Sequence, residues 1–323
     1  MRLASLGRSG LRVSDVALGT LTWGRDTDEH EAVEQLELYL AAGGNVLDTS
    51  DAYGSGAAHE IVGHLLHSLA ADDVIVVSRS GGSTSPGRPF DHSLRHLRAS
   101  LEATLTRLGR DSVDVWLVHG RDPHTPLEEV CAAMAEAVRT GKAAYVGLAE
   151  WPPAWTAAAH RLLHDALGTS LTAVQVEYSL VQRGAEHDLL DYTSHNGLGV
   201  LGWGALGRGV LTGKYRRGTP ADSRGASTHL RGFVETYLDL RSRQVVDAVC
   251  AAADGLGVAP LDVALAWARQ QPAVSTSVVG ARTAAQLRGI LAGLDTVLPP
   301  EIAAALAEVS AVRPVYPQAG AAL

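Results

Sequence analysis

The feature that most constrains the fold is a regular alternation of short apolar runs with longer amphipathic stretches. The apolar runs stand at residues 16–18, 46–47, 74–77, 113–118, 145–146, 174–176, 198–201 and 276–279. Continuous runs of this kind are typical of strands that are buried on both faces. The stretches between them have helical spacing. The clearest of these places five leucines on one helix face, at Leu94, Leu97, Leu101, Leu105 and Leu108.

Helices are also predicted around Val33, Leu36 and Leu40, after Thr125-Pro126, and over residues 153–164, 185–196 and 284–292. A strand followed by a helix, repeated eight times in 323 residues, indicates an α/β protein. We expect a closed (β/α)8 TIM barrel formed by residues 1–323 as one domain, with an open doubly wound sheet as the alternative. Residues 215–233 lack periodicity and predict a long loop after the seventh strand, and residues 312–323 predict an irregular tail. Both segments are expected to line the substrate pocket.

Composition limits the classes of partner. The chain is 46% hydrophobic and 19% charged, as in globular proteins, and its formal net charge of -8 argues against nucleic acid. No apolar run reaches 18 residues, so we expect no membrane-spanning helix. Two cysteines cannot form a disulfide framework, and the N-terminal residues leave no room for an apolar signal region. A cytoplasmic protein is therefore expected.

Two glycine-rich patterns do not indicate a nucleotide-binding motif of the usual kinds. Residues 202–207 match G-x-G-x-x-G after a strand, but a further glycine-rich segment follows where a Rossmann fold opens a helix. The glycines leave two interpretations, a tight loop or backbone that approaches a pyrophosphate. The dipeptide Gly213-Lys214 is not a P-loop, because Tyr215 stands where Ser or Thr must ligate magnesium.

Histidine pairs at helical spacing, His64 with His67 and His92 with His96, raise the question of a metal site. No third ligand is evident near either pair, and histidines on helix surfaces are common. We therefore predict no bound metal.

Chemically reactive side chains stand at the ends of three consecutive predicted strands. Asp48 ends the second strand, with Tyr53 five residues later, while Arg79 ends the third strand and His119 the fourth. In a parallel barrel these ends meet on the catalytic face. A tyrosine beside a buried cation is a suitable proton donor, because the cation favours the phenolate. The alternative for each residue alone is a satisfied polar group or a cap.

Motifs over nearly the whole chain resemble those of the aldo-keto reductases and follow the same order. Residues 48–54, Asp-Thr-Ser-Asp-Ala-Tyr-Gly, with Glu60 and Gly63, are similar to the first signature of that family. The other matching segments are Leu6-Gly7 to Ser14, Leu18-Gly19-Thr20, Arg107-Leu108-Gly109, His119 with Asp122, Gly141-Lys142, Gln175 with Tyr178, Gly207 to Tyr215, and Gly280-Ala281-Arg282 with Gln286.

The resemblance implies an NADPH-dependent reduction of an aldehyde or ketone, without a metal. By similarity, Tyr53 gives a proton to the carbonyl oxygen, His119 orients that oxygen, and Asp48 holds the cation beside Tyr53. Arg282 at the adenosine end suits a 2′-phosphate through bidentate contact, so NADPH is preferred over NADH. A small-molecule carbonyl substrate and a monomeric protein are also implied.

The resemblance further implies the residues that contact cofactor and substrate. Gln175 would bind the nicotinamide carboxamide and Trp203 would stack on the nicotinamide ring. The expected cofactor contacts are Gly19, Thr20, Glu150, Gln175, Trp203, Gly204, Leu206, Arg208, Gly280, Arg282 and Gln286. Trp23, His119 and Trp151 are expected at the substrate.

Three positions depart from the family pattern. Arg79 stands where the family carries lysine, Ala149 where it carries a serine, and Ile290 where an asparagine often holds the adenine. Arginine keeps the charge but is larger and planar. Two alternatives to reduction therefore stay open. One is a nicotinamide-nucleotide-binding protein with little catalysis, acting as a redox sensor or partner subunit, and the other is a non-redox reaction on the same barrel.

Overall fold

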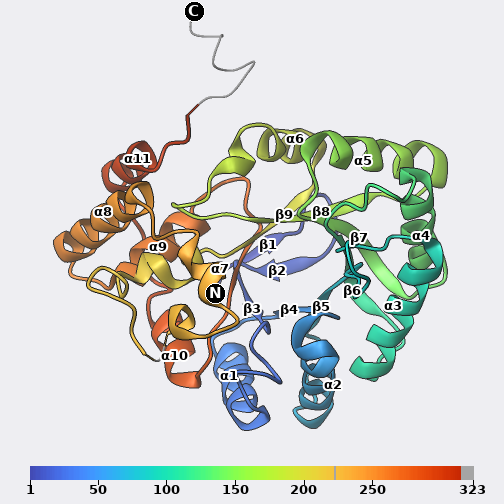
Figure 1. Ribbon diagram of the computed structural model, residues 1–323, viewed down its shortest axis with the longest axis horizontal. Helices are drawn as coiled ribbons and strands as arrows, with labels where there is room; N and C mark the ends of the chain where they lie inside the picture. The colour runs from blue at the N-terminus through green and yellow to red at the C-terminus, as the bar shows by residue number, and fades with distance from the viewer. Residues whose placement is uncertain (222, 314–323) are drawn as a thin grey trace, which may run out of the picture.

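The predicted barrel is the observed fold. The computed structural model describes residues 1–221 and 223–313, and within them parallel strands close into a barrel in the order β10-β3-β4-β5-β6-β7-β8-β9 (Figure 1). The strands are β3 (Val16–Gly19), β4 (Val46–Ser50), β5 (Ile75–Ser80), β6 (Val113–His119), β7 (Ala143–Ala149), β8 (Leu171–Glu177), β9 (Gly199–Trp203) and β10 (Thr276–Val279). Because β10 pairs with both β3 and β9, the sheet has no open edge, and this excludes the doubly wound alternative.

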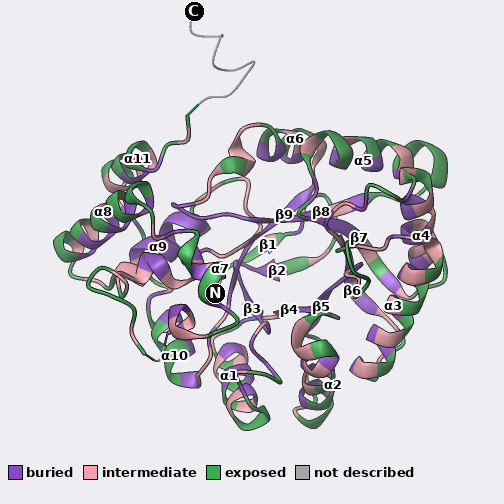
Figure 2. Cartoon of the chain, in the orientation of Figure 1, coloured by how far each residue is buried: buried purple, intermediate pink, exposed green. Residues whose placement is uncertain are grey.

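Burial of both strand faces explains why the strands read as continuous apolar runs. In β3, Val16 and Leu18 belong to the core between strands and helices, whereas Ala17 belongs to the core inside the barrel. The inner core also takes Val77 and Leu117 from β5 and β6. Figure 2 shows the strands buried and the outer helix surfaces exposed. Alternate side chains of a strand therefore point into two different cores, rather than one set into a core and the other into solvent.

Helices cover the outside of the barrel. Around it lie α1 (Glu29–Ala41), α2 (Ala57–Ser68), α3 (Leu94–Leu108), α4 (Leu127–Arg139), α5 (Pro153–Leu167), α6 (Leu189–Asn196), α8 (Leu240–Leu256), α9 (Pro260–Arg269), α10 (Ala284–Ala292) and α11 (Pro300–Val309). The leucine stripe buries Leu97, Leu101, Leu105 and Leu108 on α3, as predicted. Ser93 caps its start by accepting from the His96 N–H, and Gly109 ends it with φ of 62°. Caps and stripe together fix the helix that precedes β6.

Some elements differ from the sequence-based expectation. A hairpin of β1 (Leu3–Ser5) and β2 (Arg12–Ser14) precedes the barrel, and it places Leu6 in the inner core. The predicted helix 185–196 is a 3₁₀ turn, η2 (Gly184–Glu186), followed by α6. Three-residue strands and a broken helix give weak sequence signals, because neither spans enough residues to show a period.

The segment after β9 is irregular, as predicted, but it contains short helical turns. These are η3 (Gly207–Thr212), η4 (Arg224–Ala226) and α7 (Arg231–Glu235). Of the predicted irregular tail, residues 314–323 lie outside the described part of the chain.

No single helix in the described residues is both long and apolar enough to cross a membrane. One bent pair, α8 with α9 at 102°, meets the length and composition criteria jointly.

Candidate active site

A cavity of about 460 Å³ opens at the carboxyl ends of the barrel strands. Its size falls in the range of small-molecule and cofactor sites. Most of the predicted site residues lie in its wall, namely Gly19, Asp48, Tyr53, Arg79, His119, Trp203, Gly204, Leu206, Arg208, Gly280, Arg282 and Gln286. The barrel topology therefore brings together residues that are up to 267 positions apart in the sequence, from Gly19 to Gln286.

Asp48 is the centre of a buried hydrogen-bond chain at the bottom of this cavity. Its Oδ2 accepts from Arg79 Nη2 at 3.3 Å, and its Oδ1 accepts from Gln175 Nε2 at 2.6 Å. Thr20 donates its hydroxyl to the Asp48 carbonyl oxygen at 3.1 Å. All four side chains are buried, so the carboxylate is satisfied without water and holds the guanidinium in place.

Tyr53 begins a tight turn that follows β4. The turn η1 (Tyr53–Gly56) has left-handed backbone at Gly54, Ser55 and Gly56, with φ of 55°, 56° and 101°. At Gly56 the φ of 101° is a conformation that residues with a side chain rarely adopt, so glycine is favoured there. The guanidinium carbon of Arg79 lies 5.1 Å from the centre of the Tyr53 ring. The cation therefore lies close to the phenol, as the sequence predicts.

His119 ends β6 and is uncharged near neutral pH. Burial, with the nearby charges of Arg79 and His92, lowers the pKa of His119 to about 4. Its carbonyl oxygen accepts from His92 Nε2 at 3.1 Å, and its ring meets the edge of Phe90 at a centroid distance of 5.4 Å. A neutral imidazole can orient a carbonyl oxygen by hydrogen bonding without taking a charge into the site.

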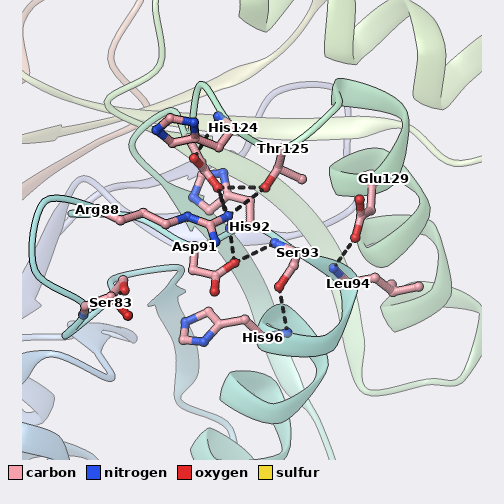
Figure 3. Close-up of polar contacts among 12 residues, drawn as sticks. Ser83, Arg88, Asp91, His92, Ser93, Leu94, His96, His124, Thr125 and Glu129 are labelled. Atoms are coloured by element: carbon pink, nitrogen blue, oxygen red, sulfur yellow. Dashed lines mark hydrogen bonds and ion pairs between the residues drawn. The ribbon is translucent and has the colours of Figure 1, made fainter.

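A second polar cluster holds the loop that carries His92 (Figure 3). Asp122 Oδ2 accepts from Arg88 Nη2 at 2.6 Å, from Thr125 Oγ1 at 2.6 Å and from the His92 N–H at 3.1 Å. Burial alone would raise the pKa of Asp122, but these hydrogen bonds and a further one from the His124 N–H lower it well below its usual range. The ionised carboxylate thus ties the loop before α3 to the loop after β6.

Trp203 and Glu150 lie at the carboxyl ends of β9 and β7. The indole N–H of Trp203 donates to Glu150 Oε1 at 2.6 Å, and the Glu177 N–H donates to the same oxygen at 2.9 Å. Burial, together with the charge of Glu177, raises the pKa of Glu150. Glu150 has φ of 58°, a left-handed conformation that non-glycine residues rarely adopt. Its two hydrogen bonds hold this strained residue against Trp203.

Arg208 connects the strand ends to the segment after β9. Its Nε and Nη2 donate to the two Glu177 carboxylate oxygens at 2.7 and 2.6 Å, and its Nη1 donates to the Phe233 carbonyl oxygen at 2.8 Å. The guanidinium carbon lies 3.9 Å from the centre of the Phe233 ring, which is parallel to Trp203 within 9°. Phe233 is therefore fixed in the cavity wall by one arginine.

The charged part of the cavity wall is mostly basic, although the chain as a whole is acidic. Within the described residues, the wall holds Arg79, Arg208, Lys214, Arg224 and Arg282 and one acid, Asp48. Arg224 donates to the Gly280 carbonyl oxygen at 3.1 Å. Burial and the nearby charge of Arg282 lower the pKa of Arg224. Two neighbouring cations in a cavity wall favour a bound anion, because the anion offsets their repulsion.

Several predicted residues lie behind the wall. Gln175 contacts the wall residue Asp48, and Glu150 contacts the wall residue Trp203. Trp23 is fully buried and donates to Gln35 Oε1 at 3.1 Å. Trp151 donates to the Val118 carbonyl oxygen at 3.1 Å and stacks on His92. These contacts give both tryptophans a packing role, and their expected substrate contacts stay predictions.

The sequence reasoning did not single out Arg224 or Phe233. Both lie in the irregular segment 215–233, which was expected to line the pocket as a whole. The sequence signal for cavity residues was the presence of basic and aromatic residues in a long loop. The sequence does not show which of these side chains point into the cavity.

The histidine pairs contact protein groups. His64 contacts Glu29, and His96 Nε2 donates to the Gly82 carbonyl oxygen at 2.9 Å. The described residues contain no group of three potential metal ligands.

Comparison with known proteins agrees with this geometry. The profile of the Aldo/keto reductase family matches residues 15–311. A probable voltage-gated potassium channel subunit beta from Oryza sativa is 35% identical, over 94% of each chain. A protein with the same description from Arabidopsis thaliana is 33% identical over 98% of this chain and 99% of its own. An L-glyceraldehyde 3-phosphate reductase from Escherichia coli is 32% identical over 89% of this chain and 86% of its own.

Proposed function

The chain belongs to the aldo/keto reductase family and is an NAD(P)H-dependent oxidoreductase, and from that premise we propose that Tyr53, Asp48, Arg79 and His119 reduce an aldehyde or ketone with NADPH. The observation that carries the proposal is the cavity wall itself. It combines a phenol, a neutral imidazole and a buried guanidinium–carboxylate pair at one end with basic side chains at the other.

The residues present fit a nicotinamide dinucleotide. Gln175 Oε1 is buried and has no hydrogen-bond partner in the described part of the chain. The resemblance assigns it to the nicotinamide carboxamide, and because Gln175 lies behind Asp48, that contact requires its side chain to turn toward the cavity. A Cβ on Gly280 would lie in tight contact with the Gly19 carbonyl oxygen, at 3.3 Å, so glycine leaves room at this point for a phosphate to approach the backbone. Arg224 and Arg282 supply charge for the phosphates, and their pairing favours NADPH over NADH.

When bound, the reduced nicotinamide supplies a hydride to the carbonyl carbon. The chain supplies the rest of the chemistry. Tyr53 donates its hydroxyl proton to the carbonyl oxygen as the C=O π bond breaks and the new C–H bond forms. His119, being neutral, hydrogen-bonds the same oxygen, and Arg79 stabilises the phenolate that remains on Tyr53. Asp48 keeps the guanidinium against the ring.

Tyr53→Phe tests this assignment, because the substitution removes only the proton donor. We expect the variant to bind NADPH as the wild type does and to lose at least about a hundredfold in kcat, the usual contribution of a positioned general acid. NADPH absorbance with an aldehyde panel measures turnover, and nicotinamide fluorescence measures binding. Retention of more than a tenth of the wild-type rate would remove Tyr53 from the role of proton donor.

A second candidate function is a nucleotide-binding subunit with little catalysis. It is favoured by the relatives described as potassium channel beta subunits and by the guanidinium at position 79. Wild-type protein that binds NADPH but turns over no aldehyde or ketone would support it. Both cysteines of the described chain are buried and unpaired, which supports the cytoplasmic location that we propose for either function.

A further inference from the structure

We propose that a second cavity, outside the active site, binds a small phosphate monoester, and that the bound anion slows the release of NADPH. This second cavity has a volume of about 240 Å³ and lies between α8 and the turn at residues 213–218 that follows η3. No described residue lines both this cavity and the one at the strand ends. The site itself does not depend on the proposed reduction, and only the effect on release rests on the binding of NADPH.

The first step is the charge of the wall of the second cavity. Arg216 and Arg217 line it from the turn, and Arg243 lines it from α8. Within the described residues, the one acid in this wall is Asp247. Cations from two separate elements thus outnumber acids here, although the whole chain has a net charge of -8. Such a wall favours an anion with more than one charge, and a phosphate monoester carries roughly -1.5 to -2 at pH 7.

The second step is the hydrogen-bond donors that these arginines leave for a ligand. The side chain of Arg217 makes no hydrogen bond or ion pair within the described part of the chain. Arg243 donates its Nε–H to the Leu238 carbonyl oxygen at 3.2 Å, and its two terminal nitrogens have no partner among the same residues. The terminal N–H bonds of two guanidinium groups therefore remain, and they match the geometry of phosphate oxygens.

The third step is the apolar part of the same wall, which distinguishes a phosphate ester from free phosphate. Val210 of η3 and Val246 of α8 are buried and line the cavity, together with Leu238 and Tyr215. Inorganic phosphate has no group that covers these side chains, whereas the organic part of an ester does. The cavity is smaller than the sites that hold drug-sized ligands, so this organic part must be small.

The fourth step is the position of the turn between the two cavities. Thr212 lines the active-site cavity, whereas Arg216 and Arg217, a few residues later, line the second cavity. Tyr237 lines the second cavity as well, and the guanidinium carbon of Arg208 lies 4.9 Å from the centre of its ring. The turn and Tyr237 therefore form a partition, with the cofactor cavity on one side and the second cavity on the other.

A bound anion would hold this partition against α8. The ion pair of Arg216 with Asp247 already joins the two, but both side chains are more than half exposed, so this pair contributes little. An anion shared by Arg217 and Arg243 adds charge-assisted hydrogen bonds between the same two elements. NADPH should therefore leave more slowly when the second cavity is occupied, because a wall of its own cavity is then held in place.

Calorimetric titration of NADPH-loaded protein with phenyl phosphate and with inorganic phosphate, in Tris chloride, tests the site. We expect phenyl phosphate to bind with a Kd below about 1 mM, and inorganic phosphate to bind about tenfold more weakly. Arg217→Gln and Arg243→Gln should each weaken phenyl phosphate by about tenfold, the value of one charge-assisted hydrogen bond. The matched control is Arg231→Gln, which removes the same charge from an exposed position outside the wall and should leave the Kd unchanged.

Stopped-flow fluorescence of NADPH-loaded protein, chased with excess NADP⁺, tests the effect on release. Saturating phenyl phosphate should slow release from the wild type by at least about fivefold, the lower end of typical coupling between two sites. The same concentration should have little effect on Arg217→Gln or Arg243→Gln. Without phenyl phosphate, both variants should release NADPH at the wild-type rate.

Each contrary result has a distinct meaning. Binding of phenyl phosphate that NADPH abolishes would place the anion in the active-site cavity, and binding that neither Arg217→Gln nor Arg243→Gln weakens would place it elsewhere; both overturn the proposal, as does the absence of saturation below about 10 mM. Equal affinity for inorganic phosphate would overturn the choice of an ester, and unchanged release would overturn the link to the cofactor. Failure to bind NADPH would instead refute the proposed function, and titration of unloaded wild type and variants would then still decide on the site.

Discussion

Release of the cofactor should depend on one arginine, and Arg208→Lys tests this directly. Arg208 holds Phe233 through a hydrogen bond of 2.8 Å to its carbonyl oxygen and through a ring contact of 3.9 Å. Lysine keeps one charge contact to Glu177 but loses both contacts to Phe233. These are worth about 2 kcal/mol together, from about 1 to 1.5 for the hydrogen bond and 0.5 to 1 for the cation–π contact.

If the segment carrying Phe233 must open before NADPH leaves, losing these contacts lowers the free energy needed to open the segment. A change of about 2 kcal/mol corresponds to a dissociation rate about thirtyfold higher. Stopped-flow fluorescence of NADPH-loaded protein, chased with excess NADP⁺, measures this rate. A rate within about twofold of the wild type would refute the reasoning.

Two further variants show whether the effect acts through Phe233. Arg216→Lys disturbs a similar pair, Arg216 Nε with Asp247 Oδ1 at 2.8 Å, but both side chains are more than half exposed, so release should not change. Phe233→Leu removes only the ring contact, about 0.5 to 1 kcal/mol, and should raise the rate by about twofold to fivefold. The double variant Arg208→Lys with Phe233→Leu should add little to Arg208→Lys alone, because Arg208→Lys already removes the ring contact. Additive effects would mean that Arg208 acts through a separate contact.

The remaining predictions concern stability. Burial and the nearby charge of Arg107 lower the pKa of His59 from 6.5 to about 4, so the unfolded chain binds this proton first as the pH falls. The free energy of unfolding, measured with urea, should therefore fall by up to about 3 kcal/mol between pH 7 and pH 4 because of His59. His59→Asn should make this free energy depend less steeply on pH, and an unchanged dependence would contradict the assignment. Asp15→Asn leaves the buried Arg269 guanidinium, now 2.6 Å from Asp15 Oδ2, without its counter-ion. We expect the variant to lose about 3 kcal/mol at pH 7 in urea unfolding, and a loss below about 1 kcal/mol would show that water replaces the carboxylate.

The barrel was predictable because its strands are buried on both faces and recur at a regular spacing. The same spacing placed Asp48, Arg79 and His119 at strand ends, and a parallel barrel brings those ends together whatever the side chains do. The hairpin of β1 and β2 was not predicted, since three-residue strands show no period. The hairpin is held by tertiary contacts at the end of the barrel that it covers, where Gly7 approaches the Gly197 carbonyl oxygen closely. A contact between residues so far apart in the sequence leaves no local sequence pattern.

The chemistry at position 79 shows where sequence reasoning stops. An arginine in place of lysine predicts a retained charge, and the observed pair with Asp48 agrees with that expectation. Which of its nitrogens stay available depends on distances to Asp48, Tyr53 and His119, which come from three separate loops and strands. A lysine directed at Asp48 would leave at most two rotating N–H bonds, whereas the arginine leaves a rigid edge. The substitution therefore changes the shape of the donor set more than its charge.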